Sequence, residues 1–268
     1  MLQRAVNRLG LGTYTLTGED GTKLITAAIE AGYRHIDTAR LYGNEAEVGD
    51  AVEAASVAQE DIFVATKVAH FEEPEKTPDY VRTAVEESLD RLGVDSINLL
   101  YHHWPRSVED LDTVLPVFQE LYEEGVVDRI GVSNYRIEDV ERAEELIDVP
   151  VTANQIEMHP LLQQDDLYEH CRERDITVVA YSPLAQGEVF DVPEIVDIAE
   201  KHDTTPALVS LAWLLSRDGV AAIPRSSSSD HIEENLDALG LKLDDEDLER
   251  IDALEETHRC EDPKWIEW

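Results

Sequence analysis

Short apolar runs alternate with amphipathic stretches along almost the whole chain. Each run has the length and composition of a buried strand, and the stretches between runs carry apolar residues at the three- to four-residue spacing of one helix face. The eight runs span residues 8–12, 35–37, 62–67, 97–103, 130–133, 151–157, 177–181 and 220–224. The predicted helices span residues 22–31, 45–58, 78–92, 108–124, 137–146, 164–174, 193–202, 206–216, 229–239 and 244–254.

This repeated order predicts an α/β fold, a parallel (β/α)8 TIM barrel. No stretch resembles an interdomain linker, so we expect one domain over residues 1–268. A doubly wound open sheet is the alternative, and such a sheet usually carries a glycine-rich turn after its first strand. Here that turn has the sequence GLGTYTLTG, which does not match GxGxxG, and the barrel is therefore favoured.

The composition is that of a soluble protein, with 43% hydrophobic residues. No apolar run approaches the roughly 18 residues that a membrane span needs, and the N-terminal segment lacks the pattern of a secretory signal. Cys171 and Cys260 have no metal-like spacing and are too few for a disulfide framework. We therefore expect a cytoplasmic protein that has no metal site.

The chain is strongly negative, because it has 59 Asp and Glu residues and only 22 Lys and Arg residues, which gives a net charge of −37. The acids are spread over the predicted helices, which indicates adaptation to a salt-rich, halophilic cytoplasm. At about 1 M salt the Debye length is roughly 3 Å, so self-repulsion is largely screened. An acidic protein from ordinary conditions is the alternative. In either case a nucleic-acid partner is disfavoured, because it would need a basic surface.

In a barrel of this type the active site lies at the C-terminal ends of the strands. The predicted strand bodies are apolar and these ends are polar, so one mouth of the barrel is marked as the site. The polar residues at the ends are Asp37, Lys67, His103, Ser133, Asn134, Gln155, Glu157, Tyr181 and Ser182.

Four residues near this mouth suit proton transfer. Asp37 and Lys67 are expected to pair, and Tyr42 follows on the loop after Asp37. The Lys67 ammonium is expected to lower the pKa of the phenol, which makes Tyr42 a proton donor to a developing alkoxide. His103 at the strand end adds a neutral N–H donor suited to a carbonyl oxygen. His102 and His103 point to opposite faces of the strand, so one of the two lies inside the barrel. The alternative is a structural salt bridge with Tyr42 as an ordinary rim or core residue.

An alkoxide requires a hydride source, and no metal-ligand spacing is present, so a nicotinamide cofactor is expected. The segment IPRSSSSDHIEEN after the last run suits its phosphates, because it offers Arg225, several hydroxyls and a helix start capped by Ser229 or Asp230. The alternative is a plain serine-rich turn that caps a helix.

Several segments together resemble the aldo-keto reductase family. They are GYRHIDTARLYGNEAEVG, FVATKV, NLLYHHWP, GVSNY, NQIEMHP, AYSPL and IPRSSSSDHIEEN, in the family's order over residues 32–235. The resemblance implies a (β/α)8 barrel that reduces aldehydes, dicarbonyls or keto-sugars with NADPH. The residues that match the catalytic tetrad are Asp37, Tyr42, Lys67 and His103, with Tyr42 as the general acid. The residues that match cofactor contacts are Ser133, Asn134 and Gln155 (carboxamide), Tyr181 (stacking), Ser182 and Leu184 (pyrophosphate), and Arg225, Ser226, Glu234 and Asn235 (adenosine-phosphate end).

Two residues depart from the family pattern at the phosphate end. Arg225 stands where the family usually has Lys, and His231 stands where it usually has an Arg that grips the adenosine 2′-phosphate. A histidine is a weaker phosphate partner, because its charge is partial at neutral pH. We therefore expect NADPH to be preferred, with appreciable use of NADH.

The predicted loops are short. There is no room for the N-terminal hairpin that often closes the barrel bottom, and the loop 104–108 and the tail 257–268 are brief. Because loops set substrate choice in barrels, we expect an open pocket for small or polar carbonyl compounds in a monomeric enzyme. Trp104 is expected to line this pocket, with Trp265 or Trp268 as further candidates.

Two other functions compete with the reductase. One is a cofactor-binding regulatory subunit, which the intact tetrad and the lack of an extra interaction segment disfavour. The other is a Schiff-base aldolase that uses Lys67, which is disfavoured because an Asp37 partner keeps the lysine protonated.

Overall fold

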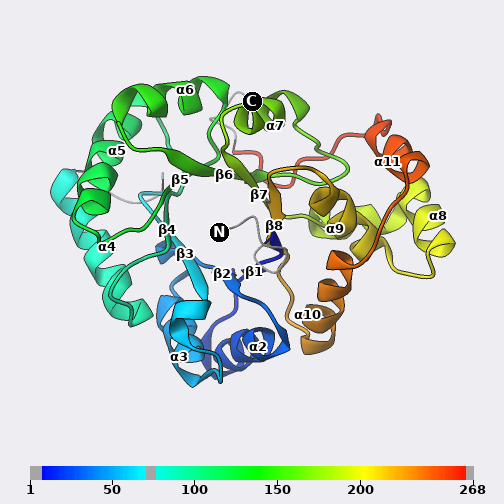
Figure 1. Ribbon diagram of the computed structural model, residues 1–268, viewed down its shortest axis with the longest axis horizontal. Helices are drawn as coiled ribbons and strands as arrows, with labels where there is room; N and C mark the ends of the chain where they lie inside the picture. Colours follow the sequence, from blue (N-terminus) through cyan, green and yellow to red (C-terminus); the bar gives the residue numbers. More distant parts are fainter. Residues whose placement is uncertain (1–7, 71–76, 264–268) are drawn as a thin grey trace.

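The computed structural model describes residues 8–70 and 77–263 of the chain. Within them, eight parallel strands form one sheet whose spatial order is the chain order. A parallel bridge between Leu9 and Ala222 joins the first and last strands, and the N–H of Gly12 donates to the carbonyl of Pro224. The strands are β1 (Leu11–Gly12), β2 (His35–Asp37), β3 (Phe63–Val68), β4 (Leu99–His102), β5 (Ile130–Ser133), β6 (Val151–Glu157), β7 (Thr177–Tyr181) and β8 (Val220–Ala222). The sheet is therefore closed, as Figure 1 shows along its axis.

Helices surround the sheet and cover its outer face (Figure 1). They are α2 (Gly18–Ala31), α3 (Glu45–Ala54), α4 (Pro78–Leu92), α5 (Val108–Glu123), α6 (Ile137–Leu146), α7 (Asp165–Arg172), α8 (Pro193–Lys201), α9 (Pro206–Ser216), α10 (Ser229–Asn235) and α11 (Asp245–Asp252). The alternation of strands and helices confirms the predicted (β/α)8 barrel. No helix of the described ranges is long and apolar enough to cross a membrane.

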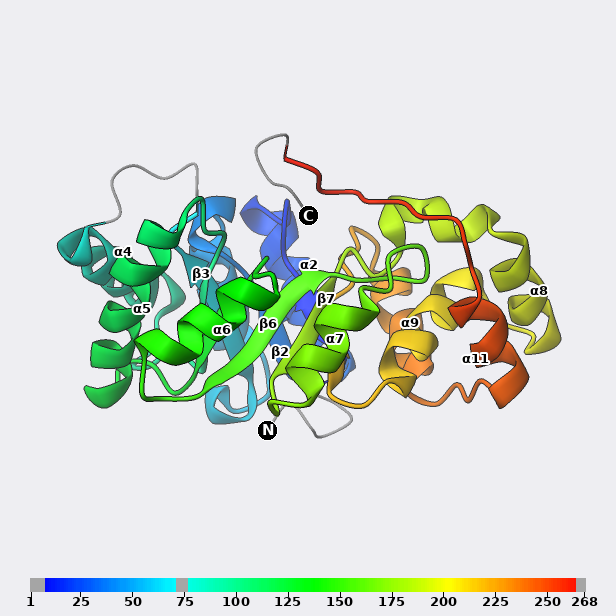
Figure 2. The ribbon, with the colours of Figure 1, turned by 90° about the horizontal axis from the view of Figure 1, so that it is seen from above.

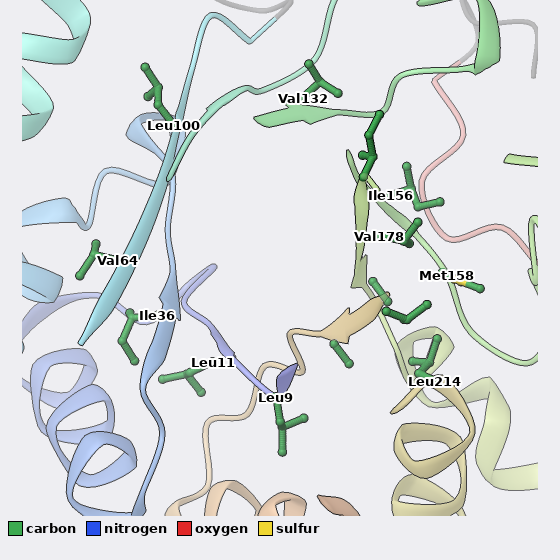
Figure 3. Packing of buried hydrophobic residues seen from close by; sticks show 14 of the residues in the cluster. Leu9, Leu11, Ile36, Val64, Leu100, Val132, Ile156, Met158, Val178 and Leu214 are labelled. Carbon is green, nitrogen blue, oxygen red and sulfur yellow. The ribbon is translucent and has the colours of Figure 1, made fainter. Parts of the chain in front are cut away.

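The strands alternate their side chains between two apolar layers, as the two-residue period of a strand requires. Outward-pointing residues such as Val64, Leu100 and Ile156 belong to the layer between sheet and helices (Figure 3). A smaller cluster fills the barrel interior and consists of Phe63, Ala65, Leu99, Tyr101, Ala153, Val179, Ala221 and Ile223. The interior is thus packed, so only the ends of the barrel are available for a ligand.

Glycine at position 131 makes room in this interior. A Cβ at Gly131 would lie 2.6 Å from the ring of Tyr101 on the neighbouring strand β4. The ring of Tyr101, which is fully buried, occupies the space that any larger residue on β5 would need.

Several boundaries differ from the sequence prediction for local reasons. The predicted strand 97–103 shortens to β4 because the side chain of Asn98 accepts the N–H of Val64. The predicted helix 164–174 begins only at Asp165, because Gln164 has a left-handed backbone with φ of 50°. The predicted helix 229–239 divides into α10 and a 3₁₀ turn, η4 (Leu236–Leu239). Three further 3₁₀ segments were not predicted, namely η1 (Arg40–Tyr42), η2 (Gln59–Asp61) and η3 (Ala185–Asp191).

The connections at the C-terminal ends of the strands form the face that carries the polar residues. The loop from β4 to α5 is short, as expected, whereas the absence of an N-terminal hairpin concerns residues 1–7, which lie outside the described residues. After α11 the chain returns across this face (Figure 2). Both cysteines are free thiols, so no disulfide joins the described parts of the chain.

Candidate active site

A cavity of about 1150 Å³ opens at the C-terminal ends of the strands. The predicted catalytic and cofactor residues and Trp104 line this cavity, except Lys67, which lies beneath its floor; Glu157, another polar strand end, does not line it. The predicted residues in the wall are Asp37, Tyr42, His103, Trp104, Ser133, Asn134, Gln155, Tyr181, Ser182, Leu184, Arg225, Ser226, His231, Glu234 and Asn235. The structure therefore brings together side chains that are spread over about 200 positions of the sequence.

Asp37 and Lys67 form a buried ion pair at the floor of the cavity. Both side chains are at most 2% exposed, and the Lys67 Nζ donates to Asp37 Oδ1 and, at 2.8 Å, to the carbonyl of Thr38. The other carboxylate oxygen of Asp37 accepts the side-chain N–H of Gln155 at 2.7 Å. The pair is thus fixed by neighbouring strand ends, because Asp37 ends β2 and Lys67 lies on β3.

Tyr42 is held over this pair by the turn η1. The turn ends at Gly43, whose φ of 69° is in the left-handed region, and the next residue, Asn44, fixes the loop by hydrogen bonds. The Asn44 side chain donates to the carbonyls of Thr13 and Leu16, each at 2.8 Å, and accepts from Thr38 at 3.0 Å. The loop that presents the tyrosine is therefore fixed by buried hydrogen bonds.

The Tyr42 ring lies at the centre of the cluster. The Lys67 Nζ is 5.1 Å from the ring centroid, and the His103 ring centroid is 5.8 Å away. On the other side, the ring of Tyr14 lies 5.1 Å from it, centroid to centroid. The phenol thus stands between an ammonium group and an imidazole, which are the groups that can assist its proton transfer.

Burial dominates the ionisation of these groups. Burial raises the pKa of Tyr42. Lys67 acts on this pKa in the predicted, lowering direction, but burial, which the sequence prediction left out, outweighs it. Burial, helped by the charge of Lys67, lowers the pKa of His103 well below its usual value. Burial also opposes the charged form of Lys67, but Asp37 and Tyr42 together outweigh burial and raise the lysine's pKa. The site therefore holds a protonated phenol, a neutral imidazole and an ammonium group.

The far wall of the cavity combines an aromatic ring with amide and hydroxyl groups. The Tyr181 hydroxyl donates to Asn134 Oδ1 at 2.9 Å, and the Asn134 amide donates to Ser133 Oγ at 3.1 Å. Asn134 and Ser182, just after β5 and β7, have positive φ of 60° and 47°. These left-handed residues turn the chain sharply at the strand ends, and so they fix the side chains in the wall.

Arg225 and Ser226 follow β8 at the rim of the cavity. The Arg225 guanidinium donates to the carbonyl of Tyr14 and to the Thr15 hydroxyl, which joins the loops after the first and last strands. The cap of the next helix is Ser228, whose Oγ accepts the N–H of His231, and so neither Ser229 nor Asp230 is the cap. The helix begins at Ser229 as predicted, but its cap lies one residue before the first predicted candidate, because four consecutive serines offer equivalent caps.

The sequence model of the Aldo/keto reductase family matches residues 8–256. The chain belongs to the aldo/keto reductase family. This aldo/keto reductase is 37% identical over 251 residues to the glyoxal reductase of Bacillus subtilis, covering 93% of this chain and 89% of that protein. It is 37% identical over 259 residues to the 9,11-endoperoxide prostaglandin H2 reductase of Trypanosoma cruzi, covering 94% and 89%.

Solved structures of the aldo/keto reductase family agree with the barrel. MGS-M4, an aldo-keto reductase enzyme from a Medee basin deep-sea metagenome library, superposes with a TM-score of 0.87 at 35% identity, covering 91% of this chain and 89% of that one. The aldose reductase of Schistosoma japonicum gives a TM-score of 0.86 at 30% identity, covering 94% and 89%.

Sequence reasoning missed part of the wall of this aldo/keto reductase. Tyr14 and His70 lie just beyond strand ends, and a search extended by two or three residues past each apolar run finds them. The His70 ring lies 4.6 Å from that of His103, centroid to centroid. Glu261 and Pro263 come from the C-terminal tail, where no pattern in the sequence indicates them. Trp265 and Trp268, predicted as candidates for the pocket, lie outside the described residues.

Proposed function

We propose that this oxidoreductase reduces small aldehydes and dicarbonyls to alcohols with NADPH as the preferred hydride donor. The observation that carries the proposal is the buried Asp37–Lys67 pair beneath Tyr42, with a neutral His103 beside it and the cavity in front. A structural salt bridge alone does not account for a phenol placed at the open side of the pair. The family and the named activity of the Bacillus relative support the same reaction class.

Each residue of the cluster has a separate part in this proposal. Tyr42 donates its phenolic proton to the carbonyl oxygen as negative charge develops there. Lys67 stabilises the phenolate that remains, and Asp37 keeps Lys67 protonated and in place. His103 orients the carbonyl oxygen by donating an N–H. The nicotinamide, when bound, supplies the hydride.

The far wall fits a nicotinamide cofactor. Tyr181 offers an aromatic face for the ring, and the Ser133, Asn134 and Gln155 side chains offer donors and acceptors for a carboxamide. Ser182 and Leu184 continue the wall towards Arg225 and Ser226, which suit phosphate. His231, Glu234 and Asn235 border the same end and complete the proposed adenosine side. A pocket of this length suits an extended dinucleotide better than a small substrate alone.

The substrate occupies the remainder of the cavity in this proposal. Trp104, Tyr14 and His70 surround the open side of Tyr42 and leave room for a small carbonyl compound. The test is to mix the protein with NADPH and glyoxal or a reactive aldehyde in high salt and to follow the absorbance of the reduced nicotinamide. Consumption no faster than that of a Tyr42→Phe variant would exclude the reductase.

Arg225 is expected to set the preference for NADPH. Replacing it with Ala removes one charged hydrogen bond to the extra phosphate, so the KM for NADPH should rise roughly tenfold, while that for NADH should change little. The His231→Ala variant should show a smaller effect, because an imidazole offers fewer N–H donors to a phosphate than a guanidinium does. Equal increases of both KM values would instead mean that Arg225 acts only by holding the loop at Tyr14 and Thr15.

The charge of −37 supports a halophilic, cytoplasmic enzyme. Because carboxylates repel one another over a surface with few cations, the melting temperature should rise by several degrees between about 0.1 M and about 2 M KCl. A thermal scan by circular dichroism at several salt concentrations measures this. A melting temperature that is constant or falls with salt would favour an ordinary acidic protein. We propose further that the chain is a single domain and a monomer.

A further inference from the structure

We propose that Glu261 is a specificity-determining residue that disfavours carbonyl substrates carrying a negative charge, and that Glu157 is the positioning residue that holds Glu261 in the cavity wall. The inference rests on the proposed reductase function. It concerns the C-terminal tail, which crosses the face of the barrel where the cavity opens (Figure 2).

The side chain of Glu157 binds the backbone of the C-terminal tail. The residue ends β6, its side chain is fully buried, and its two oxygens accept the N–H groups of Cys260 at 2.6 Å and Glu261 at 2.9 Å. Just before this point the N–H of His258 donates to the carbonyl of Leu161 at 2.9 Å. Three backbone bonds within four residues therefore fix the course of the tail. Two of the three depend on one buried carboxylate.

The same carboxylate also meets His159, whose Nε2 lies 3.0 Å from Glu157 Oε1. Burial opposes ionisation, but the hydrogen bonds from His159 and from the tail outweigh it and lower the pKa of Glu157. Glu157, His159 and Cys260 lie close enough to hold a metal ion. We assign an anchor instead, because both carboxylate oxygens already accept N–H donors from the chain.

Glu261 brings a negative charge to the rim of the cavity. Glu261, an exposed residue, lines the cavity, as does Pro263, whereas the neighbouring Arg259 and Asp262 do not. Burial and the charge of Glu157 raise the pKa of Glu261, which reflects two carboxylates close together in partly dehydrated surroundings. Burial raises the pKa of Tyr181 well above its ordinary value, the charges of Glu157 and then Glu261 act in the same direction, and that of Arg259 opposes them. Glu261 thus lies near the aromatic wall that faces the reacting groups.

Arg259 does not line the cavity, and its charge lowers the pKa of Tyr181 by less than that of Glu261 raises it. The charged groups of the described wall do not cancel the charge of Glu261 either. Asp37 is paired with Lys67 on the floor, and Arg225 and Glu234 lie at the opposite, phosphate end. A substrate that carries a carboxylate beside its carbonyl group must approach Glu261 with like charge. At an effective dielectric constant of about 20, two carboxylates a few ångströms apart repel each other enough to weaken substrate binding several-fold or more.

The test compares two aldehydes of similar size, 4-nitrobenzaldehyde, which is neutral, and 4-carboxybenzaldehyde, which is anionic. Replacing Glu261 with Gln should raise kcat/KM for the anionic aldehyde by about fivefold and leave that for the neutral one within twofold. The Asp262→Asn variant is the matched control, because it removes an adjacent carboxylate that does not line the cavity. Equal changes for both aldehydes, or an equal change in the control, would overturn the inference. If the wild type reduces neither aldehyde, the proposed function itself fails.

The anchor is tested separately through the thiol of Cys260, one of only two in the chain. Burial and the charge of Glu157 raise its pKa to about 12, so the thiol should react slowly with a disulfide reagent, and Cys171 is fully buried. Replacing Glu157 with Gln should speed labelling by roughly tenfold and reduce the discrimination between the two aldehydes. A Cys260→Ser variant identifies the labelled thiol. Unchanged labelling in a folded Glu157→Gln protein would exclude the anchor, and the Glu261 variant tests specificity if that protein does not fold.

Discussion

Replacing Tyr42 with Phe is expected to lower kcat by roughly a thousandfold, the middle of the usual range for a positioned proton donor. The ring keeps its contacts with His103 and Tyr14, so the fold and cofactor binding should persist. What disappears is the phenolic O–H between Lys67 and the cavity, which is the group proposed to give a proton to the carbonyl oxygen.

The measurement is steady-state and single-turnover reduction of an aldehyde, together with NADPH affinity from quenching of protein fluorescence. Tyr14→Phe is the matched control, because this tyrosine lies 5.1 Å from Tyr42 in the same wall and is 62% exposed. The kcat of the Tyr14→Phe variant should fall by less than tenfold. A Tyr42→Phe enzyme within tenfold of the wild type would show that another group supplies the proton.

Replacing Lys67 with Met should abolish most of the activity and also lower the free energy of unfolding by about 3–5 kcal/mol. The side chain is replaced by one of similar length, but Asp37 is left as a buried charge with Gln155 as its remaining side-chain donor. Activity falls because the phenolate of Tyr42 loses the charge that stabilises it during proton transfer. Urea unfolding followed by circular dichroism measures the loss of stability.

A double variant separates the two effects of Lys67. In Asp37→Asn with Lys67→Met the uncompensated charge is gone, so most of the stability should return, while kcat stays low. If activity returned along with stability, the ion pair would be structural and the catalytic proposal for Lys67 would be wrong. If neither returned, local packing would account for the loss.

Much of the barrel was predictable because its strands are short apolar runs bounded by polar residues. The strands 130–133, 151–157 and 177–181 came out with the predicted bounds. The strand around Leu99 is shorter than predicted, because the N–H of Val64 donates to the side chain of Asn98 and not to a backbone carbonyl. The pattern of hydrophobic residues does not indicate a side-chain hydrogen bond of this kind. The 3₁₀ turns were also missed. The one that holds Tyr42, η1, is followed by Asn44, whose tertiary hydrogen bonds fix the loop.

The candidate site was predictable where its residues end strands, and unpredictable where other segments meet them. Asp37, Lys67 and His103 follow from the topology of a parallel barrel, since the ends of all strands lie at one face. Glu261 joins this face because Glu157, more than 100 positions earlier, binds its backbone. The raised pKa of Tyr42 was also not predicted, because the extent of burial is a property of the folded molecule.

The course of the tail has a practical consequence for anyone who fuses another protein or an affinity tag to this chain. Arg8 lies at the opposite end of the barrel, where its guanidinium donates to the carbonyl of Val220 at the start of β8. Pro263, in contrast, lines the cavity a few residues before the last position of the sequence. A fusion joined directly after Pro263 is attached beside the cavity, whereas one joined directly before Arg8 is attached at the opposite end of the barrel. Kinetic constants measured on the two fusions are therefore not interchangeable.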